Sequence, residues 1–151
     1  MGWLKTQLLC LGALIAVLSW LEPMATGMAA EPLDGIWRGE MNCAKLSFTK
    51  GSQKVPVEVV VSGRSVTFAR KVWNQDNSSV VGTEEGSGEV DANGEIKISS
   101  VWKSTAAKPR FAFTGSYVGR LQMSVASLTG TQVWTFDGRI ENRVCSVSLK
   151  R

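Results

Sequence analysis

Histidine is absent from this chain of 151 residues. Its absence excludes Ser-His-Asp and Cys-His catalytic arrangements and removes the most common metal ligand. Glu84 and Glu85 are adjacent, but neighbours in an extended chain point in opposite directions, so they cannot converge on one substrate. We interpret them as part of a solvated, glycine-flanked loop. The sequence therefore predicts a protein that is not an enzyme and that needs no metal or cofactor.

Long apolar runs are scarce as well. The run from Leu8 to Leu21 is shorter than the roughly 18 residues that a membrane-spanning helix needs. Lys5 precedes this run, Glu22-Pro23 ends it, and small residues follow as far as Ala30, which is the pattern of a secretory signal peptide. We expect residues 1–30 to be a cleaved signal, with an uncleaved anchor as the alternative. Residues 31–151 are then expected to form one periplasmic or secreted domain without a transmembrane segment.

Cysteine is also rare, with three in the chain, of which Cys10 falls inside the predicted signal. Cys43 and Cys145 remain, and two cysteines in a short exported chain usually form a disulfide. In the chain-entropy model, closing a loop of about 100 residues adds ~4–5 kcal/mol of stability. The alternative is a pair of metal-binding thiolates, which would need carboxylates to complete the site.

No segment after residue 30 shows the 3.6-residue period of an amphipathic helix. Apolar and polar residues instead alternate in about eight or nine short segments, separated by turn signals such as Asn93-Gly94. The alternation shifts by one between Cys43 and Ala44 and continues through Phe48, which predicts a bulge or a sharp bend near Cys43. Residues 74–86 are polar and predict a loop that contains at most a short strand.

This pattern predicts an all-β fold, a small antiparallel β-barrel of about eight strands, with a β-sandwich as the alternative. A disulfide between Cys43 and Cys145 would bring the first and last strands together, since its Cα atoms must lie about 4.4–6.8 Å apart. Adjacent first and last strands can close a meander and remove its edges. The barrel is therefore the preferred interpretation.

The segment Gly35-Ile36-Trp37, at the start of the first predicted strand, resembles the Gly-x-Trp signature of calycins, the superfamily that includes lipocalins and avidins. The resemblance implies a barrel whose tryptophan closes one end and is covered by an arginine from a late strand. Arg143 or Arg151 could supply that arginine here. The chain also resembles small exported proteobacterial proteins, and neither resemblance implies an activity.

The net charge of +4 is spread along the chain. Basic residues without clusters are poor support for nucleic-acid binding, and an exported protein rarely meets nucleic acid. We therefore expect no nucleic-acid partner. An unidentified small ligand, or a protein or envelope partner, is expected instead.

The tryptophans point to a candidate binding site. Trp37 and Trp134 lie within apolar stripes and are predicted to be core residues. Trp73 and Trp102 each stand near the end of a strand beside a polar loop, and basic residues accompany them. The predicted site for an anionic or sugar-like ligand consists of Trp73, Trp102, Arg70, Lys103 and Arg110. The alternative is that both tryptophans only seal the end of the barrel.

A non-enzymatic binding protein is accordingly the leading functional prediction. The first alternative is an inhibitor of lysozyme or of a protease, because Ser62-Gly63-Arg64 resembles part of the inhibitory loop of periplasmic lysozyme inhibitors. Ser-Gly is also a common hairpin dipeptide, so an ordinary turn is the preferred interpretation of this segment. The second alternative is a structural protein of the cell envelope whose positive charge meets anionic surfaces.

Overall fold

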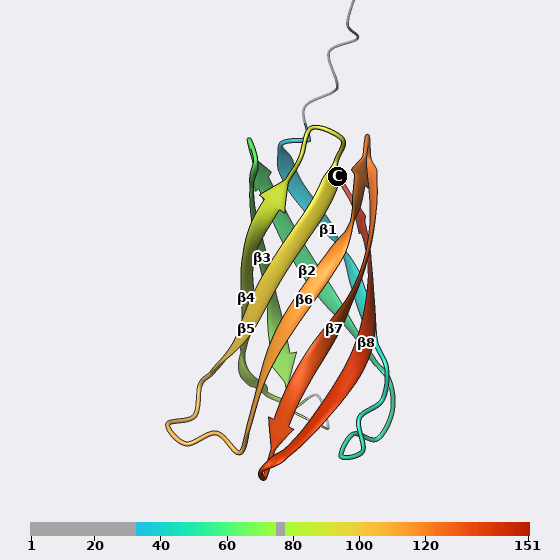
Figure 1. Cartoon of the computed structure of the whole chain (residues 1–151). Coiled ribbons are helices and arrows are strands. Elements are labelled where there is room, and N and C mark those ends of the chain that lie inside the picture. The colour runs from blue at the N-terminus through green and yellow to red at the C-terminus, as the bar shows by residue number, and fades with distance from the viewer. Residues whose placement is uncertain (1–32, 75–77) are drawn as a thin grey trace, which may run out of the picture.

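The computed structural model describes residues 33–74 and 78–151, so the predicted signal, residues 1–30, lies outside the described residues. Eight antiparallel strands follow one another around a closed barrel (Figure 1). They are β1 Gly35–Cys43, β2 Gln53–Ser62, β3 Ser65–Trp73, β4 Val80–Val90, β5 Glu95–Ser104, β6 Phe111–Gln122, β7 Val125–Phe136 and β8 Arg139–Lys150. The predicted all-β barrel is confirmed. Within the described ranges no helix has the length and apolar character to cross a membrane.

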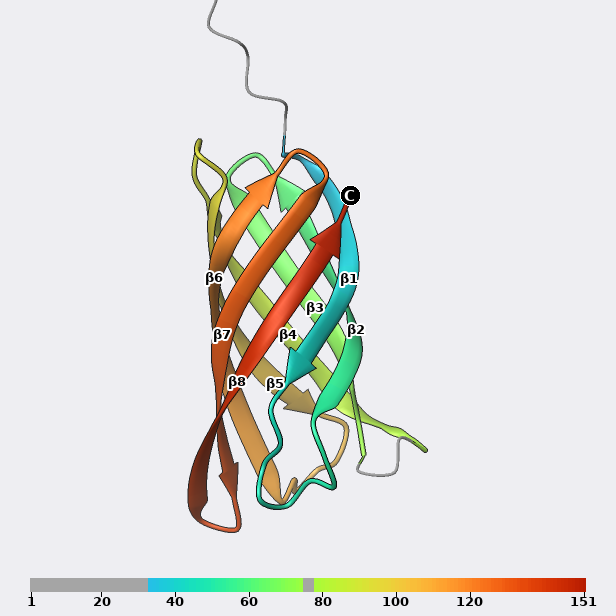
Figure 2. The ribbon, with the colours of Figure 1, turned by 90° about the vertical axis from the view of Figure 1, so that its right-hand side faces the viewer.

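The barrel closes where β1 pairs with β8, and Figure 2 shows these two strands side by side. Cys43 and Cys145 are directly opposite in this ladder, their Cα atoms are 4.0 Å apart, and a disulfide joins them. The predicted disulfide is confirmed. Because every strand pairs with two neighbours, the sheet leaves no edge exposed, which excludes the sandwich.

The two ends of the barrel differ. We call the end where β2, β4 and β6 finish the turn end, because tight turns follow these strands. The opposite end is the loop end, where the connections after β1, β3 and β5 are longer (Figure 1). Trp37 is fully buried towards the turn end and its indole N–H donates to the Leu33 carbonyl at 3.0 Å. The Arg151 guanidinium lies 5.9 Å from the Trp37 ring centre, whereas Arg143 lies over Trp134.

Inward-facing side chains form two apolar clusters along the barrel axis. The larger one extends from the turn end and contains Trp37, Phe68, Tyr117 and the disulfide. The smaller one, at the loop end, contains Trp102 and Trp134. Trp37 and Trp134 are 0% and 5% exposed, so the prediction that both are core residues is confirmed.

One predicted local feature is confirmed in part and a second is wrong. The chain bends after Cys43, as one of the two alternatives predicted, but β1 ends there and the residues through Phe48 do not continue as a strand. The chain turns there, with the Leu46 N–H donating to Thr49 Oγ1 at 2.9 Å, and Leu46 packs into the cluster at the loop end. β4 begins at Val80 and includes Glu84 and Glu85, which were predicted to lie in a solvated loop. The alternation was hidden because the inward residues around Glu84 are glycines rather than apolar side chains.

Candidate functional site

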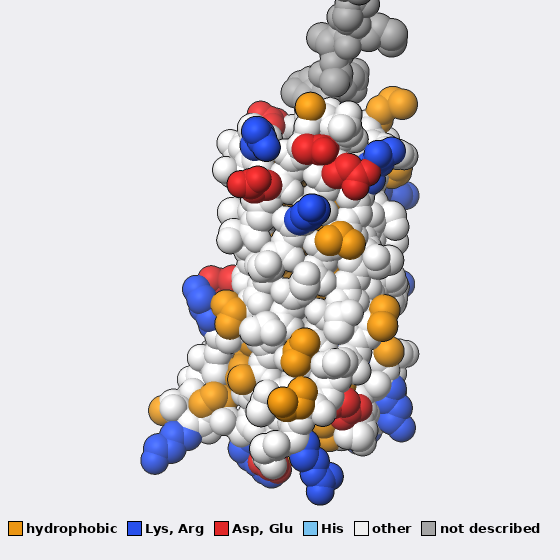
Figure 3. Space-filling view, in the orientation of Figure 1, with side chains coloured by type: hydrophobic (Ala, Val, Ile, Leu, Met, Phe, Trp, Pro, Cys, Tyr) orange, Lys and Arg blue, Asp and Glu red, His pale blue; other side chains and the backbone are white. Residues whose placement is uncertain are grey.

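A groove with a volume of about 380 Å³ lies at the loop end, beside the connection between β5 and β6. Its apolar lining includes Val81, Trp102, Pro109, Phe111 and Phe136, and Lys108 and Arg110 add positive charge. Arg110 donates to Asp137 at 2.7 Å, and its guanidinium lies 5.4 Å from the Phe136 ring centre. Basic side chains are visible around the loop end in Figure 3, below a wall with few charges.

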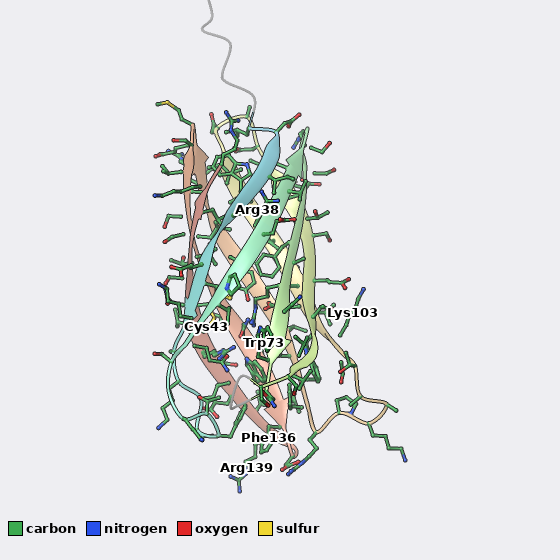
Figure 4. All side chains as sticks on the ribbon, turned by 180° about the vertical axis from the view of Figure 1, so that it is seen from behind. Arg38, Cys43, Trp73, Lys103, Phe136 and Arg139 are labelled. Carbon is green, nitrogen blue, oxygen red and sulfur yellow. A yellow bond between two sulfur atoms is a disulfide. The ribbon has the colours of Figure 1, made fainter. Side chains whose placement is uncertain are left out.

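The structure brings only part of the predicted site together. Trp102 and Arg110 both line the groove, whereas Trp73 is half-buried and does not. Lys103 points outward from the barrel wall (Figure 4), where it forms an ion pair with Glu85. Arg70 was expected at the mouth, but it is 5% exposed and lies inside the barrel. The reason is strand parity, since Arg70 and Val72 of β3 share the inward face while Lys71 faces out.

Aromatic side chains at the groove pack against others that lie further inside the barrel. We call this set the aromatic cluster, and it consists of Phe48, Trp102, Phe111, Phe113, Trp134 and Phe136. Trp102 stacks on Phe111 with ring centres 4.4 Å apart, and Phe113 stacks on Trp134 at 4.1 Å. Phe48, from the β1–β2 connection, stacks on Phe136 at 4.6 Å. Trp102 is 7% exposed and its indole nitrogen has no hydrogen-bond partner. The loop end is thus filled by rings that continue inward from the groove.

A buried polar layer lies next to the aromatic cluster. We define it as Arg70, Glu84, Ser100, Tyr117, Gln132 and Arg143, which come from β3 to β8. Glu84 is 0% exposed and is the centre of this layer. Its Oε1 accepts from Ser100 Oγ at 2.6 Å and from Tyr117 OH at 2.7 Å. Its Oε2 accepts from Arg70 Nε and, at 2.9 Å, from Gln132 Nε2.

Gln132 connects this carboxylate to the second buried arginine. Its side-chain Oε1 accepts from Arg143 Nε at 2.7 Å and from Trp134 Nε1 at 3.1 Å. Arg143 Nη1 donates to Gln53 at 2.8 Å. Arg143 therefore has neutral partners only among these hydrogen bonds. The Glu84 carboxylate is left to balance two guanidinium groups, so the layer carries an excess positive charge.

Burial changes the acid–base properties of two members of the layer. Desolvation, together with the positive charge of Arg70, lowers the pKa of Arg143 to about 10. Desolvation and the adjacent Glu84 carboxylate raise the pKa of Tyr117. At neutral pH Arg143 therefore stays charged and the Tyr117 hydroxyl keeps the proton that it donates to Glu84.

Gly115 provides the space that the polar layer occupies. A Cβ atom at this position would lie 2.4 Å from Ser100 Oγ and 2.8 Å from Glu84 Oε1. We expect Gly115→Ala to lower the free energy of unfolding by about 1–3 kcal/mol, the usual effect of overpacking. Urea unfolding followed by tryptophan fluorescence measures this. Gly51→Ala is the control, because nothing lies within 4 Å of the added atom; equal losses in both variants would contradict the packing role.

Sequence reasoning missed most of the polar layer because its members are far apart along the chain. Glu84, Gln132 and Arg143 each occupy an inward position where the alternation would place an apolar residue. A polar residue at a position where the alternation predicts an apolar one was the signal in the sequence that could have identified these members of the layer. Gln132 and Arg143 are paired in the β7–β8 register, but a register between strands cannot be read from composition.

The turn Ser62-Gly63-Arg64 lies at the turn end, at the opposite end of the barrel from the groove. Gly63 has a φ of 58°, a left-handed conformation that favours glycine. Its N–H donates to Asp34 Oδ1 at 2.9 Å. These contacts account for the glycine as a turn residue, and inhibition through this turn stays a prediction.

Comparison of the chain with protein-family models, with curated proteins and with solved structures finds no match.

Proposed function

We propose that this chain is an exported, non-enzymatic protein that binds a small ligand at the loop end of its barrel. The ligand has an apolar body and one negatively charged group. The observation that carries the proposal is the groove, which combines aromatic side chains from three strands with the positive charge of Lys108 and with Arg110, which is ion-paired with Asp137. Small-ligand sites are typically apolar hollows of about 300–1,000 Å³ with a few polar groups that orient the ligand. The groove has this size and this composition.

Two further features support the proposal. Arg110 lies over Phe136, so the cation and the ring together suit a flat ligand that carries negative charge. The disulfide between Cys43 and Cys145 suits an oxidising compartment, which is consistent with export.

The test uses the fluorescent aromatic anion 1-anilinonaphthalene-8-sulfonate with the purified protein. We expect saturable binding, and we expect the double variant Lys108→Ala/Arg110→Ala to bind about tenfold more weakly, equivalent to about 1.4 kcal/mol. The dissociation constant is measured by titration at fixed ionic strength, because exposed charges are screened by salt.

Lys103→Ala is the matched control, since Lys103 is a nearby lysine on the outer wall. It removes one positive charge without altering the groove, so its dissociation constant is expected to equal that of the wild type. A loss of binding free energy in the control about half that of the double variant, in proportion to the one and two charges removed, would show that net charge alone attracts the dye. Absence of saturable binding to the wild type would reject the proposed function.

A further inference from the structure

The Glu84 carboxylate has no capacity left for further donors. It accepts hydrogen bonds from Arg70, Ser100, Tyr117 and Gln132, which occupy the roughly four acceptor positions of a carboxylate. Any other buried donor in the polar layer must therefore find a partner elsewhere.

Two such donors exist in the polar layer. The Nη2 atoms of Arg70 and Arg143 are both buried and neither has a hydrogen-bond partner. The two residues are 5% and 2% exposed, so bulk water does not solvate these groups. A buried guanidinium needs both hydrogen bonds and a counter-charge, and the layer offers one carboxylate for two guanidiniums. An added anion would supply the missing acceptors and the missing negative charge together.

The two guanidiniums also lie at the inner side of the aromatic cluster. Arg70 is 5.7 Å from the Phe113 ring centre and Arg143 is 4.8 Å from that of Trp134. Phe113 and Trp134 stack on each other, and contacts through Phe111 and Trp102 continue to the groove. The two guanidinium groups thus contact the inner end of a continuous set of rings, and the outer end of this set lines the groove at the loop end.

We propose that Arg70 and Arg143 together bind the carboxylate of a ligand whose apolar body lies among the rings of the aromatic cluster. Guanidinium groups suit this role because their planar N–H donors match the two oxygens of a carboxylate. The inference rests on the proposed function in one respect, namely that the ligand enters at the groove. Entry requires the rings to move apart, including Phe48, which lies on the β1–β2 connection and stacks on Phe136.

The test compares 2-naphthoate with 2-naphthamide, which has nearly the same shape and no charge, by isothermal titration calorimetry. We expect the acid to bind at least about tenfold more tightly than the amide, as expected when a charged rather than a neutral hydrogen bond forms. In Arg143→Gln the two compounds should bind equally well, with the affinity for the amide unchanged. Arg143 is the residue to change because its hydrogen-bond partners are neutral, so its removal leaves no carboxylate unpaired.

Arg139→Gln is the control, because Arg139 is an exposed arginine at the loop end (Figure 4). It should keep the preference for the acid. If Arg143→Gln does not fold, Arg143→Lys is used instead, because it retains the charge and loses the planar guanidinium. Its ratio of affinity for the acid to affinity for the amide should be lower than that of the wild type and higher than 1. Equal affinity of the wild type for acid and amide would overturn the inference and leave the proposed function intact.

A second measurement tests the interior carboxylate site when neither naphthalene compound binds. The melting temperature is recorded in sodium formate and in sodium chloride at equal concentration. A higher value in formate for the wild type, absent in Arg143→Gln, would support the interior carboxylate site and reject entry of an apolar ligand. No difference between the salts, together with no naphthoate binding, would overturn the inference, as expected if only a water molecule satisfies the two Nη2 atoms; the proposed function is decided separately by the binding of the dye at the groove.

Discussion

Replacing Glu84 with glutamine is expected to lower the free energy of unfolding by about 3–5 kcal/mol, the usual cost of removing one charged partner of a buried ion pair. Glutamine has the same shape, so packing is retained. The change removes the negative charge that is paired with Arg70 and also acts on Arg143, and it places an amide where a carboxylate accepts four hydrogen bonds. Two buried guanidiniums would then lack a counter-charge. Urea unfolding at neutral pH measures the loss.

Glu85→Gln is the matched control for this prediction. Glu85 is the next residue of the same strand, faces outward and pairs with the exposed Lys103, so its neutralisation should leave stability close to that of the wild type. A double-mutant cycle adds a second check. In Glu84→Gln/Arg143→Gln the excess positive charge falls, and we expect part of the lost stability to return. A Glu84→Gln variant as stable as Glu85→Gln would refute the account of the polar layer.

Removal of the disulfide in Cys43→Ser/Cys145→Ser is expected to lower the free energy of unfolding by ~4–5 kcal/mol, the chain-entropy estimate for a loop of about 100 residues. This is a large share of the roughly 5–15 kcal/mol that stabilises a domain. The bond lies in the ladder that closes the barrel and joins its first and last strands. That ladder runs only from Arg38 opposite Lys150 to Cys43 opposite Cys145, so it has few other contacts to replace the bond.

Urea unfolding of the oxidised protein, the reduced protein and the serine variant measures this effect. The reduced protein and the serine variant should agree, since both release the same loop. A loss below about 1 kcal/mol would show that the β1–β8 hydrogen bonds keep the barrel closed without the bond, against the chain-entropy account.

Local sequence patterns brought together some residues that line the groove and others that do not. Trp102 and Arg110 were identified because each stands near a polar connection, and the structure places both at one groove. Lys103 and Arg70 were grouped with them by nearness along the chain. Alternation separates them, because Lys103 faces outward and Arg70 faces inward. Sequence proximity to a loop therefore grouped residues that lie towards one end of the barrel, but it did not give the direction of each side chain.

The sequence by itself determined the all-β class, the approximate number of strands and the pairing of Cys43 with Cys145. These features depend on local alternation, on turn residues and on having two cysteines left to pair. Only the tertiary structure decided that Glu84 is a buried strand residue and that Arg70 and Arg143 share its layer. Polar residues at inward positions look like loop residues in the sequence, and they become a site only when the registers of several strands bring them together.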